Sequence, residues 1–322
     1  MSAGILPSSA KAAQIVKLSP ALKQLLKSRN PDPLESPSAL SLTKVFTSTL
    51  VDAKERTKAS VQRSPEKAVT QNDYEGILRT CLTIMTATLL TKNIPSTMGA
   101  LYRFATTINP ESGTLASAEP VSLGLRTQRT AVMREAGLKC TVLVGIPRTI
   151  NTLGALREAT NEDVKVALDT QLNGKPYFSW PEQASEEELQ QRGGQLFDLI
   201  YTPHTSKLLE KLGTSHPDFP GFIVQHAYGG SLSNRPLPSS TPPLISRTLV
   251  SALAIACLRA QGRVGPQLTS HVLGLLKAAN EGGPQTLHER WLSSEEGVEW
   301  VIESVDRVCD VVSPPSTNMA KL

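Results

Sequence analysis

Helical periodicity runs through nearly the whole sequence from Leu40 onward. Residues 43–63 and 72–92 are two examples, and the second carries Asn72 or Asp73 where a helix N-cap is expected. No segment shows the sustained alternation with β-branched residues that is typical of a half-buried strand. The sequence therefore predicts an all-α fold.

Size and charge narrow the class of protein. A chain of 322 residues that is 39% hydrophobic can bury a sizeable core, as one large domain or two smaller ones. Its 33 basic and 29 acidic residues are interspersed, and only 4% of its residues are aromatic, so nucleic acid is not an expected partner. The longest apolar run, residues 249–258, is about half of the roughly 20 residues that span a bilayer, so no membrane span is expected.

Cysteine usage indicates a reducing compartment. The four cysteines are far apart, with no Cys-x-x-Cys and no Cys/His pair at zinc-site spacing. We expect them to be small buried hydrophobes, with no disulfide and no bound metal. They are Cys81, Cys140, Cys257 and Cys309.

Proline-rich and glycine-rich segments divide the chain into parts. Residues 94–106 and 146–160 share Ile-Pro and Gly-Ala-Leu, which indicates two related helical units, although helix-start convergence would give the same pattern. Ser185 and Glu188 have the spacing of a capping box near the start of the second unit. The predicted parts are an N-terminal helix and linker (residues 1–39), a first helical unit (40–170), a second helical unit (171–310) and a flexible tail (311–322).

The two ends carry competing targeting signals. The sequence ends in Ala320, Lys321 and Leu322, a variant of the tripeptide that the peroxisomal import receptor reads, so we expect a peroxisomal protein. The first 31 residues contain five basic residues and no acid, as a mitochondrial presequence can, and mitochondrion is the alternative. The same region also reads as an ordinary amphipathic helix, with Ser19 as its cap and Pro20 in the first turn.

A histidine lies on the inward face of the helix predicted at residues 265–283. His271 shares a helical stripe with Leu268, Val272 and Leu275, and Gly274 would allow a helix or a ligand to come close. A buried imidazole can act as a general acid or base, or it can be a core residue with a satisfied ring, and the sequence leaves both open. The remaining histidines are expected at the surface: His204, His216, His226 and His288.

Four motifs occur in the order of a known superfamily. "RGGQLFDLIY", "PDFPGFIVQHAYGGSL", "SRTLVSALAIACL" and "QLTSHVLGLLKAA" resemble the carboxymuconolactone decarboxylase and alkylhydroperoxidase D-like superfamily, and the chain is similar to its fungal peroxisomal members. The earlier segment at residues 134–160 resembles the closing segment of these proteins, and the resemblance covers residues 70–280. It implies an alkylhydroperoxidase D-like helical bundle, repeated within the chain and assembled into a homo-oligomer.

The resemblance also implies a site. His271 matches the histidine of the family, Arg247 the residue at the head of the preceding helix, and Tyr228 and Gly229 an aromatic-glycine pair. His226 is the neighbouring candidate for substrate binding. A decarboxylase of this kind uses no metal and no cofactor: His271 would move a proton and Arg247 would hold the carboxylate of a small carboxylate or lactone substrate. The other interpretation of Arg247 is a solvated residue at a helix start.

Departures from the family pattern keep three functions open. Val264 and Gln267 stand where hydroperoxidase members have their Cys-x-x-Cys pair, and Ala252 stands where those members have a glutamate. Peroxide reduction of the Cys-x-x-Cys type is therefore not expected. A cofactor-independent lyase, an inactive fold that acts as a binding or scaffold protein, and a hydroperoxidase that uses an isolated cysteine, Cys257 or Cys140, are the alternatives.

Overall fold

The computed structural model describes most of the chain and divides it into two units, Met1–Glu35 and Ser36–Leu322. The predicted targeting residues Ala320, Lys321 and Leu322 lie outside the described residues, as does the start of the basic N-terminal region. The described residues are 18–28, 36–62, 69–115, 121–170, 184–234, 243–281 and 285–313.

The first unit contains the helix α1 (Pro20–Ser28). It begins as predicted: the hydroxyl of Ser19 accepts a hydrogen bond from the backbone N–H of Leu22 at 3.2 Å, and Pro20 occupies the first turn. Within the described part of this unit, α1 has no buried residue.

The second unit is built from helices, which confirms the all-α prediction. In the described residues its strands are a single two-residue antiparallel pair, β1 (Ile108–Asn109) and β2 (Thr114–Leu115). Its helices are α2 (Ala39–Gln62), α3 (Gln71–Lys92), η1 (Pro95–Thr97), α4 (Met98–Thr107), α5 (Leu123–Val144), α6 (Ile146–Ala159), α7 (Glu162–Thr170), α8 (Glu186–Tyr201), α9 (Thr205–Ser215), α10 (Phe219–Phe222), η2 (Ile223–Leu232), α11 (Arg247–Gln261), α12 (Gly265–Lys277), η3 (Ala278–Asn280), α13 (Leu287–Leu292) and α14 (Glu295–Val312).

Helices α3 and α11 form the centre of the core. Every residue of α11 from Thr248 to Leu258 is buried, because α3, α5, α12 and α14 all pack against this helix. Helices from both predicted units therefore share one core. The predicted boundary between residues 170 and 171 coincides with the start of a segment outside the described residues, and the division into two related units stays a prediction.

The two repeated segments lie against each other. The first copy forms η1 and α4, and the second forms the continuous helix α6, which packs on both. Each copy has its proline in the first turn of a helix, as the pattern predicts. Whether they descend from one duplicated unit stays a prediction.

Helix α3 begins earlier than its predicted cap. Thr70, not Asn72 or Asp73, is the N-cap, since its hydroxyl accepts from the N–H of Asp73 while the Asp73 carboxylate accepts from the N–H of Thr70. The predicted cap was wrong because Asp73 fills the N3 position of a capping box. By contrast, the capping box of Ser185 and Glu188 at the start of α8 is confirmed.

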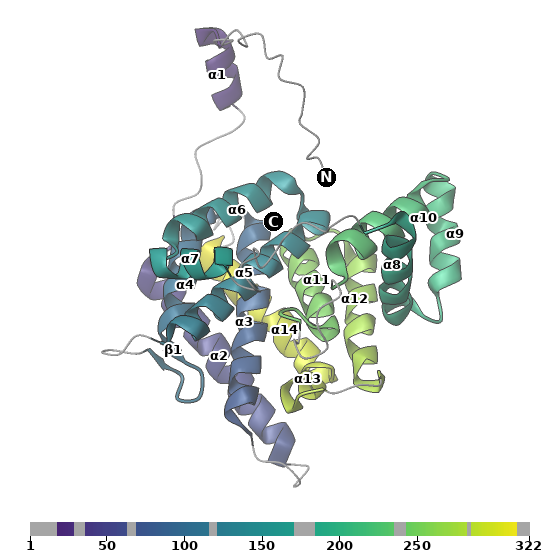
Figure 1. Ribbon diagram of the computed structural model, residues 1–322. Coiled ribbons are helices and arrows are strands. Elements are labelled where there is room, and N and C mark those ends of the chain that lie inside the picture. Colours follow the sequence, from purple (N-terminus) through teal and green to yellow (C-terminus); the bar gives the residue numbers. More distant parts are fainter. Residues whose placement is uncertain are drawn as a thin grey trace, which may run out of the picture. The chain divides into compact units, whose positions relative to one another are not determined.

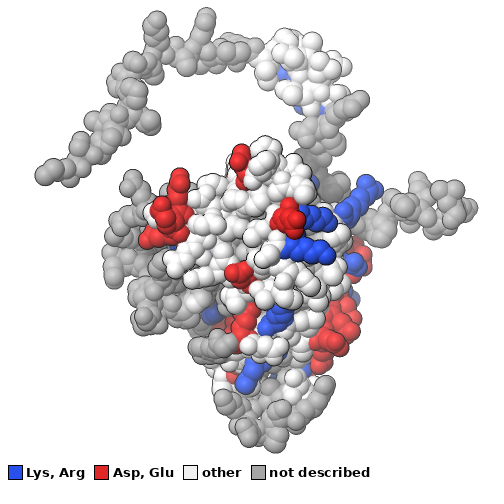
Figure 2. Space-filling view, turned by 90° about the vertical axis from the view of Figure 1, so that its right-hand side faces the viewer, with Lys and Arg blue, Asp and Glu red and all other residues white. Residues whose placement is uncertain are grey.

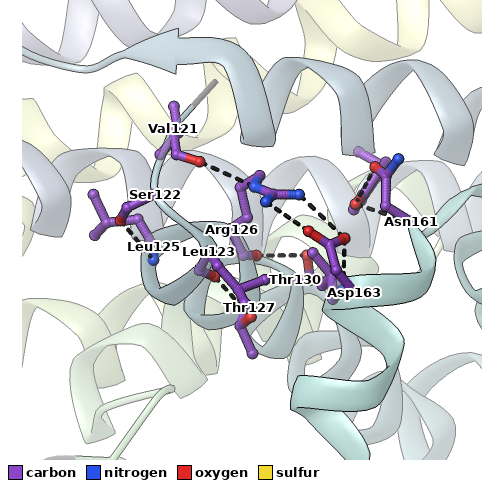
Figure 3. Close-up of polar contacts among 11 residues, drawn as sticks. Val121, Ser122, Leu123, Leu125, Arg126, Thr127, Thr130, Asn161 and Asp163 are labelled. Atoms are coloured by element: carbon purple, nitrogen blue, oxygen red, sulfur yellow. Dashed lines mark hydrogen bonds and ion pairs between the residues drawn. The ribbon is translucent and has the colours of Figure 1, made fainter. Parts of the chain in front are cut away.

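An arginine joins the start of α5 to α7. Figure 3 shows Arg126 between the two helices, where its side chain donates to both oxygens of Asp163, at 2.7 and 3.3 Å, and to the carbonyl oxygen of Val121. The same contact lowers the pKa of the Asp163 carboxyl. Ser122 caps α5 by accepting from the N–H of Leu125.

The helices α8, α9 and α10 lie together at one side of the second unit, with α12 between them and α11 (Figure 1). On the face that Figure 2 presents, basic and acidic side chains are interspersed and neither kind forms a continuous stripe. Among the described helices, none is long and apolar enough to cross a membrane.

Candidate functional site

A π-helix packs closely against α8 in the second unit. Residues Ile223–Leu232, which were expected to hold only an aromatic-glycine motif, wind as the π-helix η2. A Cβ added at Gly193 would overlap the carbonyl oxygen of Val224, and one added at Gly229 would overlap that of Leu189. Gly229 is thus required for the contact between the two backbones, and extended π-helices are rare and often occur at functional sites.

Lys139 of α5 holds the end of this π-helix. Its ammonium donates to the carbonyl oxygens of Leu232 at 2.8 Å and Ser233 at 3.1 Å, and forms an ion pair with Glu135 at 3.5 Å. The side chain is only 2% exposed, so a buried cation satisfies the free carbonyls of a helix terminus. Sequence reasoning missed Lys139, because nothing in the sequence connects it to carbonyls more than 90 residues away.

Two tyrosine hydroxyls meet beside the π-helix. Tyr228 is buried, and its hydroxyl lies 2.7 Å from that of Tyr201 in the last turn of α8. Phe197 packs against both rings, with centroid distances of 4.4 Å to Tyr201 and 5.0 Å to Tyr228. Burial raises the pKa of both hydroxyls, so both are protonated near neutral pH and can donate hydrogen bonds.

His271 lies next to this pair. The residue is 3% exposed, and its ring meets that of Tyr201 edge-on at a centroid distance of 6.1 Å. Its Nδ1 is buried and has no hydrogen-bond partner in the described part of the chain. Burial, helped by the positive charge of Arg247, lowers the pKa of His271 to about 4, so the imidazole is neutral at pH 7.

Gly274 brings three helices together one turn beyond His271. A Cβ at this position would lie 2.9 Å from Cγ2 of Ile200 on α8 and 3.4 Å from the hydroxyl of Ser251 on α11. This confirms that Gly274 allows another helix to approach, and it places α8, α11 and α12 around the histidine.

Arg247 is built into the structure and is not a solvated residue at a helix start. Its guanidinium donates to Glu281 at 2.8 Å, to Ser251 at 2.9 Å, and to the carbonyl oxygens of Gly274 and Leu199 at 3.1 and 3.2 Å. Burial lowers its pKa, while the charge of Glu281 acts in the opposite direction. Its Nε is buried and unpartnered within the described residues.

A second basic side chain donates hydrogen bonds to the end of α8. Lys277, in the last turn of α12, donates to the carbonyl oxygens of Ile200 and Thr202 at 2.7 Å each. Together with Arg247 it satisfies carbonyls at the C-terminus of α8, where positive charge is favourable. Arg247 and Lys277 therefore have a structural role whatever else they do.

The structure brings most of the predicted site residues together. Tyr228 and Gly229 lie on η2, His271 on α12 and Arg247 on α11, and these helices are joined in a row, since α8 packs on η2 and α12, and α12 packs on α11. His226 does not share their environment: its side chain is exposed, and its ring lies 5.4 Å from that of Phe222.

Two residues of the candidate site were not predicted from the sequence, Tyr201 and Glu281. Tyr201 ends the quoted motif "RGGQLFDLIY", and its spacing of four residues from Phe197 places both on one face of a helix. Glu281, the acidic partner of Arg247, is 34 residues away from it along the chain, and no motif indicated the pairing. An acid was sought at position 252, where α11 carries the buried Ala252.

His288 was expected at the surface, and that expectation was wrong. It is fully buried on α13, with Nε2 at 2.8 Å from the Thr80 hydroxyl and Nδ1 at 3.2 Å from the Thr57 hydroxyl. The six-residue helix α13 packs on α2 and α3, which carries the ring into the core. In the ranges that the structure describes, no group of three or more histidine, cysteine or acidic side chains is arranged to hold a metal ion.

Comparison with known proteins gives one partial match. The chain is 29% identical over 163 residues to Peroxisomal protein 2 of Saccharomyces cerevisiae. The match covers 46% of this chain and 55% of the length of the yeast protein. No protein-family profile and no solved structure matches the chain.

Proposed function

We propose that this chain is a peroxisomal member of the carboxymuconolactone decarboxylase and alkylhydroperoxidase D-like superfamily, acting as a cofactor-independent lyase on a small carboxylate or lactone. The observation that carries the proposal is the buried, unpartnered Nδ1 of His271 beside the hydroxyl pair of Tyr201 and Tyr228. Buried polar groups are nearly always paired, so an unpaired imidazole among other polar groups is a candidate contact for a ligand.

The charges around His271 suit a carboxylate substrate. An anion bound near the ring would offset the effect of Arg247 and raise the pKa of His271 from about 4 towards neutral. The Nε of Arg247 is a guanidinium donor without a partner among the described residues, whereas Nη1 donates to Ser251 and Nη2 to Glu281. In a decarboxylation, the C–C bond to the carboxylate breaks, carbon dioxide leaves, and the electron pair remains on the substrate as an enolate. Protonated His271 then delivers its proton to that carbanion.

The experiment is a binding and turnover screen of the full chain with small carboxylates and lactones. Binding is measured by calorimetry and carbon dioxide release is measured directly. We expect His271→Gln to remove turnover, because glutamine has no titratable proton, whereas His226→Gln, at an exposed position, leaves it unchanged. Equal activity in His271→Gln and the unsubstituted chain would contradict the proposal.

The second candidate function is a binding or scaffold protein that has lost catalysis. The observation that favours it is the engagement of Arg247 with Glu281, Ser251 and two backbone carbonyls, which is what a purely structural arginine does. Under this alternative, Arg247→Lys lowers stability because lysine cannot reach all four acceptors, and no compound in the screen is turned over. Carbon dioxide release that His271→Gln abolishes would exclude it.

The peroxisomal assignment is supported by two findings. A partial relative bears the name Peroxisomal protein 2, and the printed sequence ends in Ala320, Lys321 and Leu322. We expect a fluorescent protein fused ahead of Met1 to collect in peroxisomes and to disperse when residues 320–322 are deleted. A fusion behind Leu322 tests the mitochondrial alternative, since it masks the tripeptide and leaves the basic N-terminus free.

A homo-oligomer also belongs to this proposal. Ile146 and Ile150, one turn apart on α6, are 62% and 65% exposed, and a second copy would remove this apolar surface from water. Sedimentation analysis of the full chain, compared with Ile150→Lys, tests this point: the variant is expected to shift towards the monomer.

A further inference from the structure

Two cysteines that are isolated in the sequence are in contact in the fold. The Sγ atoms of Cys140 on α5 and Cys257 on α11 lie 3.4 Å apart, although the residues are separated by 117 positions. Both side chains are fully buried where α5 packs against α11. Cys257 was taken to be alone because nearby sequence holds no second cysteine, and that expectation was wrong.

We propose that Cys140 and Cys257 form an oxidisable dithiol, which hydrogen peroxide converts into an intramolecular disulfide. In the first step a thiolate attacks one peroxide oxygen, the O–O bond breaks, and a sulfenic acid and a hydroxide form. In the second step the other sulfur attacks the sulfenic sulfur and expels hydroxide, which leaves as water. Overall, two thiols and one peroxide give one disulfide and two waters, with two electrons passing from sulfur to oxygen.

Proximity decides the product of this reaction. The second sulfur is already in van der Waals contact, so a sulfenic acid on either cysteine meets a thiol before it meets another peroxide. Disulfide formation requires the sulfurs to close from 3.4 Å to about 2.05 Å, a change of about 1.4 Å.

Burial sets the rate and the selectivity. It raises the pKa of Cys140, so little thiolate is present at neutral pH and oxidation is slow compared with that of an exposed thiol. A closely packed interior admits a molecule of the size of hydrogen peroxide far more readily than a bulky aromatic disulfide reagent. Cys309 is only partly buried and is the described thiol that such a reagent reaches more easily.

The dithiol is distinct from the site around His271. Cys257 lies ten positions after Arg247 on α11, which corresponds to about 15 Å along the helix axis. Its oxidation therefore needs neither a carboxylate substrate nor the proposed lyase activity, and failure of one proposal does not decide the other.

The experiment uses the full chain carrying Cys309→Ser, which removes the more accessible thiol. The protein is exposed to hydrogen peroxide, denatured, alkylated and analysed by intact mass and peptide mapping. We expect a loss of the mass of two hydrogens, a peptide pair linked through Cys140 and Cys257, and recovery of both thiols on reduction. The bulky disulfide reagent should leave both thiols unmodified in the folded protein.

Matched variants complete the test. Cys140→Ala and Cys257→Ala, each in the Cys309→Ser background and checked for native helix content by circular dichroism, should give no linked pair. Cys81→Ala should leave the pair intact, since Cys81 is not part of it. The proposal is overturned if both thiols remain alkylatable after a peroxide exposure many times longer than the one that fully oxidises Cys309 in the unsubstituted chain. It is equally overturned if Cys140 is found linked to Cys81 or converted to a sulfinic acid.

Discussion

The molecule contains two buried histidines in very different environments, His288 and His271. The ring of His288 has a hydrogen-bond partner on each nitrogen and packs at a tilt against Trp291 in the core, where α13 meets α2 and α3. The ring of His271 is nearly as buried, but its Nδ1 is unpartnered in the described residues and its neighbour is a tyrosine pair. The first environment is that of a structural residue, and the second is that of a candidate for chemistry.

The protonation state of His288 follows from its partners. The Thr80 hydroxyl has one hydrogen and donates it to the carbonyl oxygen of Gly76, so it accepts from His288, and Nε2 carries the proton. Nδ1 then accepts from the Thr57 hydroxyl. In the neutral ring of His288, both nitrogens therefore form a hydrogen bond, whereas Nδ1 of His271 forms none within the described residues. Removal of each ring in turn tests this difference.

The largest difference between the two sites is expected when each histidine is replaced by leucine and the free energy of unfolding is measured. His288→Leu leaves the buried Thr57 hydroxyl without its partner and Thr80 with one fewer, at about 1–3 kcal/mol for each unsatisfied group, so we expect a loss of about 3 kcal/mol in the free energy of unfolding. His271→Leu removes a polar atom that was already unpaired, so a change of less than about 1 kcal/mol is expected. Urea denaturation at pH 7.5 measures both, and equal losses would remove the distinction between the two sites.

The pH dependence of the free energy of unfolding gives a second test of the two histidines. Burial lowers the pKa of His288 to about 3 and that of His271 to about 4, below the unfolded value of 6.5. The unfolded chain therefore binds more protons below pH 6.5. Stability is full above that pH and falls by about 1.4 kcal/mol per pH unit for each histidine as the pH decreases towards the folded pKa. His271→Leu should reduce the loss between pH 6.5 and 5 by about 2 kcal/mol. An unchanged pH dependence would show that His271 is already solvated in the folded state.

Local sequence patterns predicted part of the fold and part of the candidate site. The period of the apolar residues predicted the helices and the inward position of His271, and the spacing of Ser185 and Glu188 predicted a cap, because these are interactions between residues close in the chain. The partners of Arg247, the contact of Cys140 with Cys257 and the burial of His288 depend on helices that meet only in the folded chain. The π-helix also escaped prediction, because the contacts of Gly193 and Gly229 that accompany it appear only when α8 is in place.

A bound carboxylate should increase the difference between the pKa values of His271 and His288. The negative charge favours the protonated imidazole, so the pKa of His271 is expected to rise by one unit or more, which corresponds to about 1.4 kcal/mol of coupling. His288 is enclosed by threonine and tryptophan side chains and should keep its pKa. Nuclear magnetic resonance titration of the imidazole signals, with and without a carboxylate from the binding screen, measures both values. Equal shifts of the two rings would indicate a general effect of the salt.

The smallest effect concerns the hydroxyl pair that neighbours His271 and has no counterpart at His288. Tyr228→Phe or Tyr201→Phe removes one side of a single hydrogen bond and leaves the other hydroxyl unpaired, so each should cost about 1 kcal/mol of unfolding free energy. The double variant should cost no more than either single variant, because the bond is lost only once and no hydroxyl is left unsatisfied. A cost equal to the sum of the two single costs would mean that each hydroxyl has its own partner. In that case the tyrosines would not be a closed pair, and one of them would be available to hydrogen-bond His271 or a molecule bound beside it.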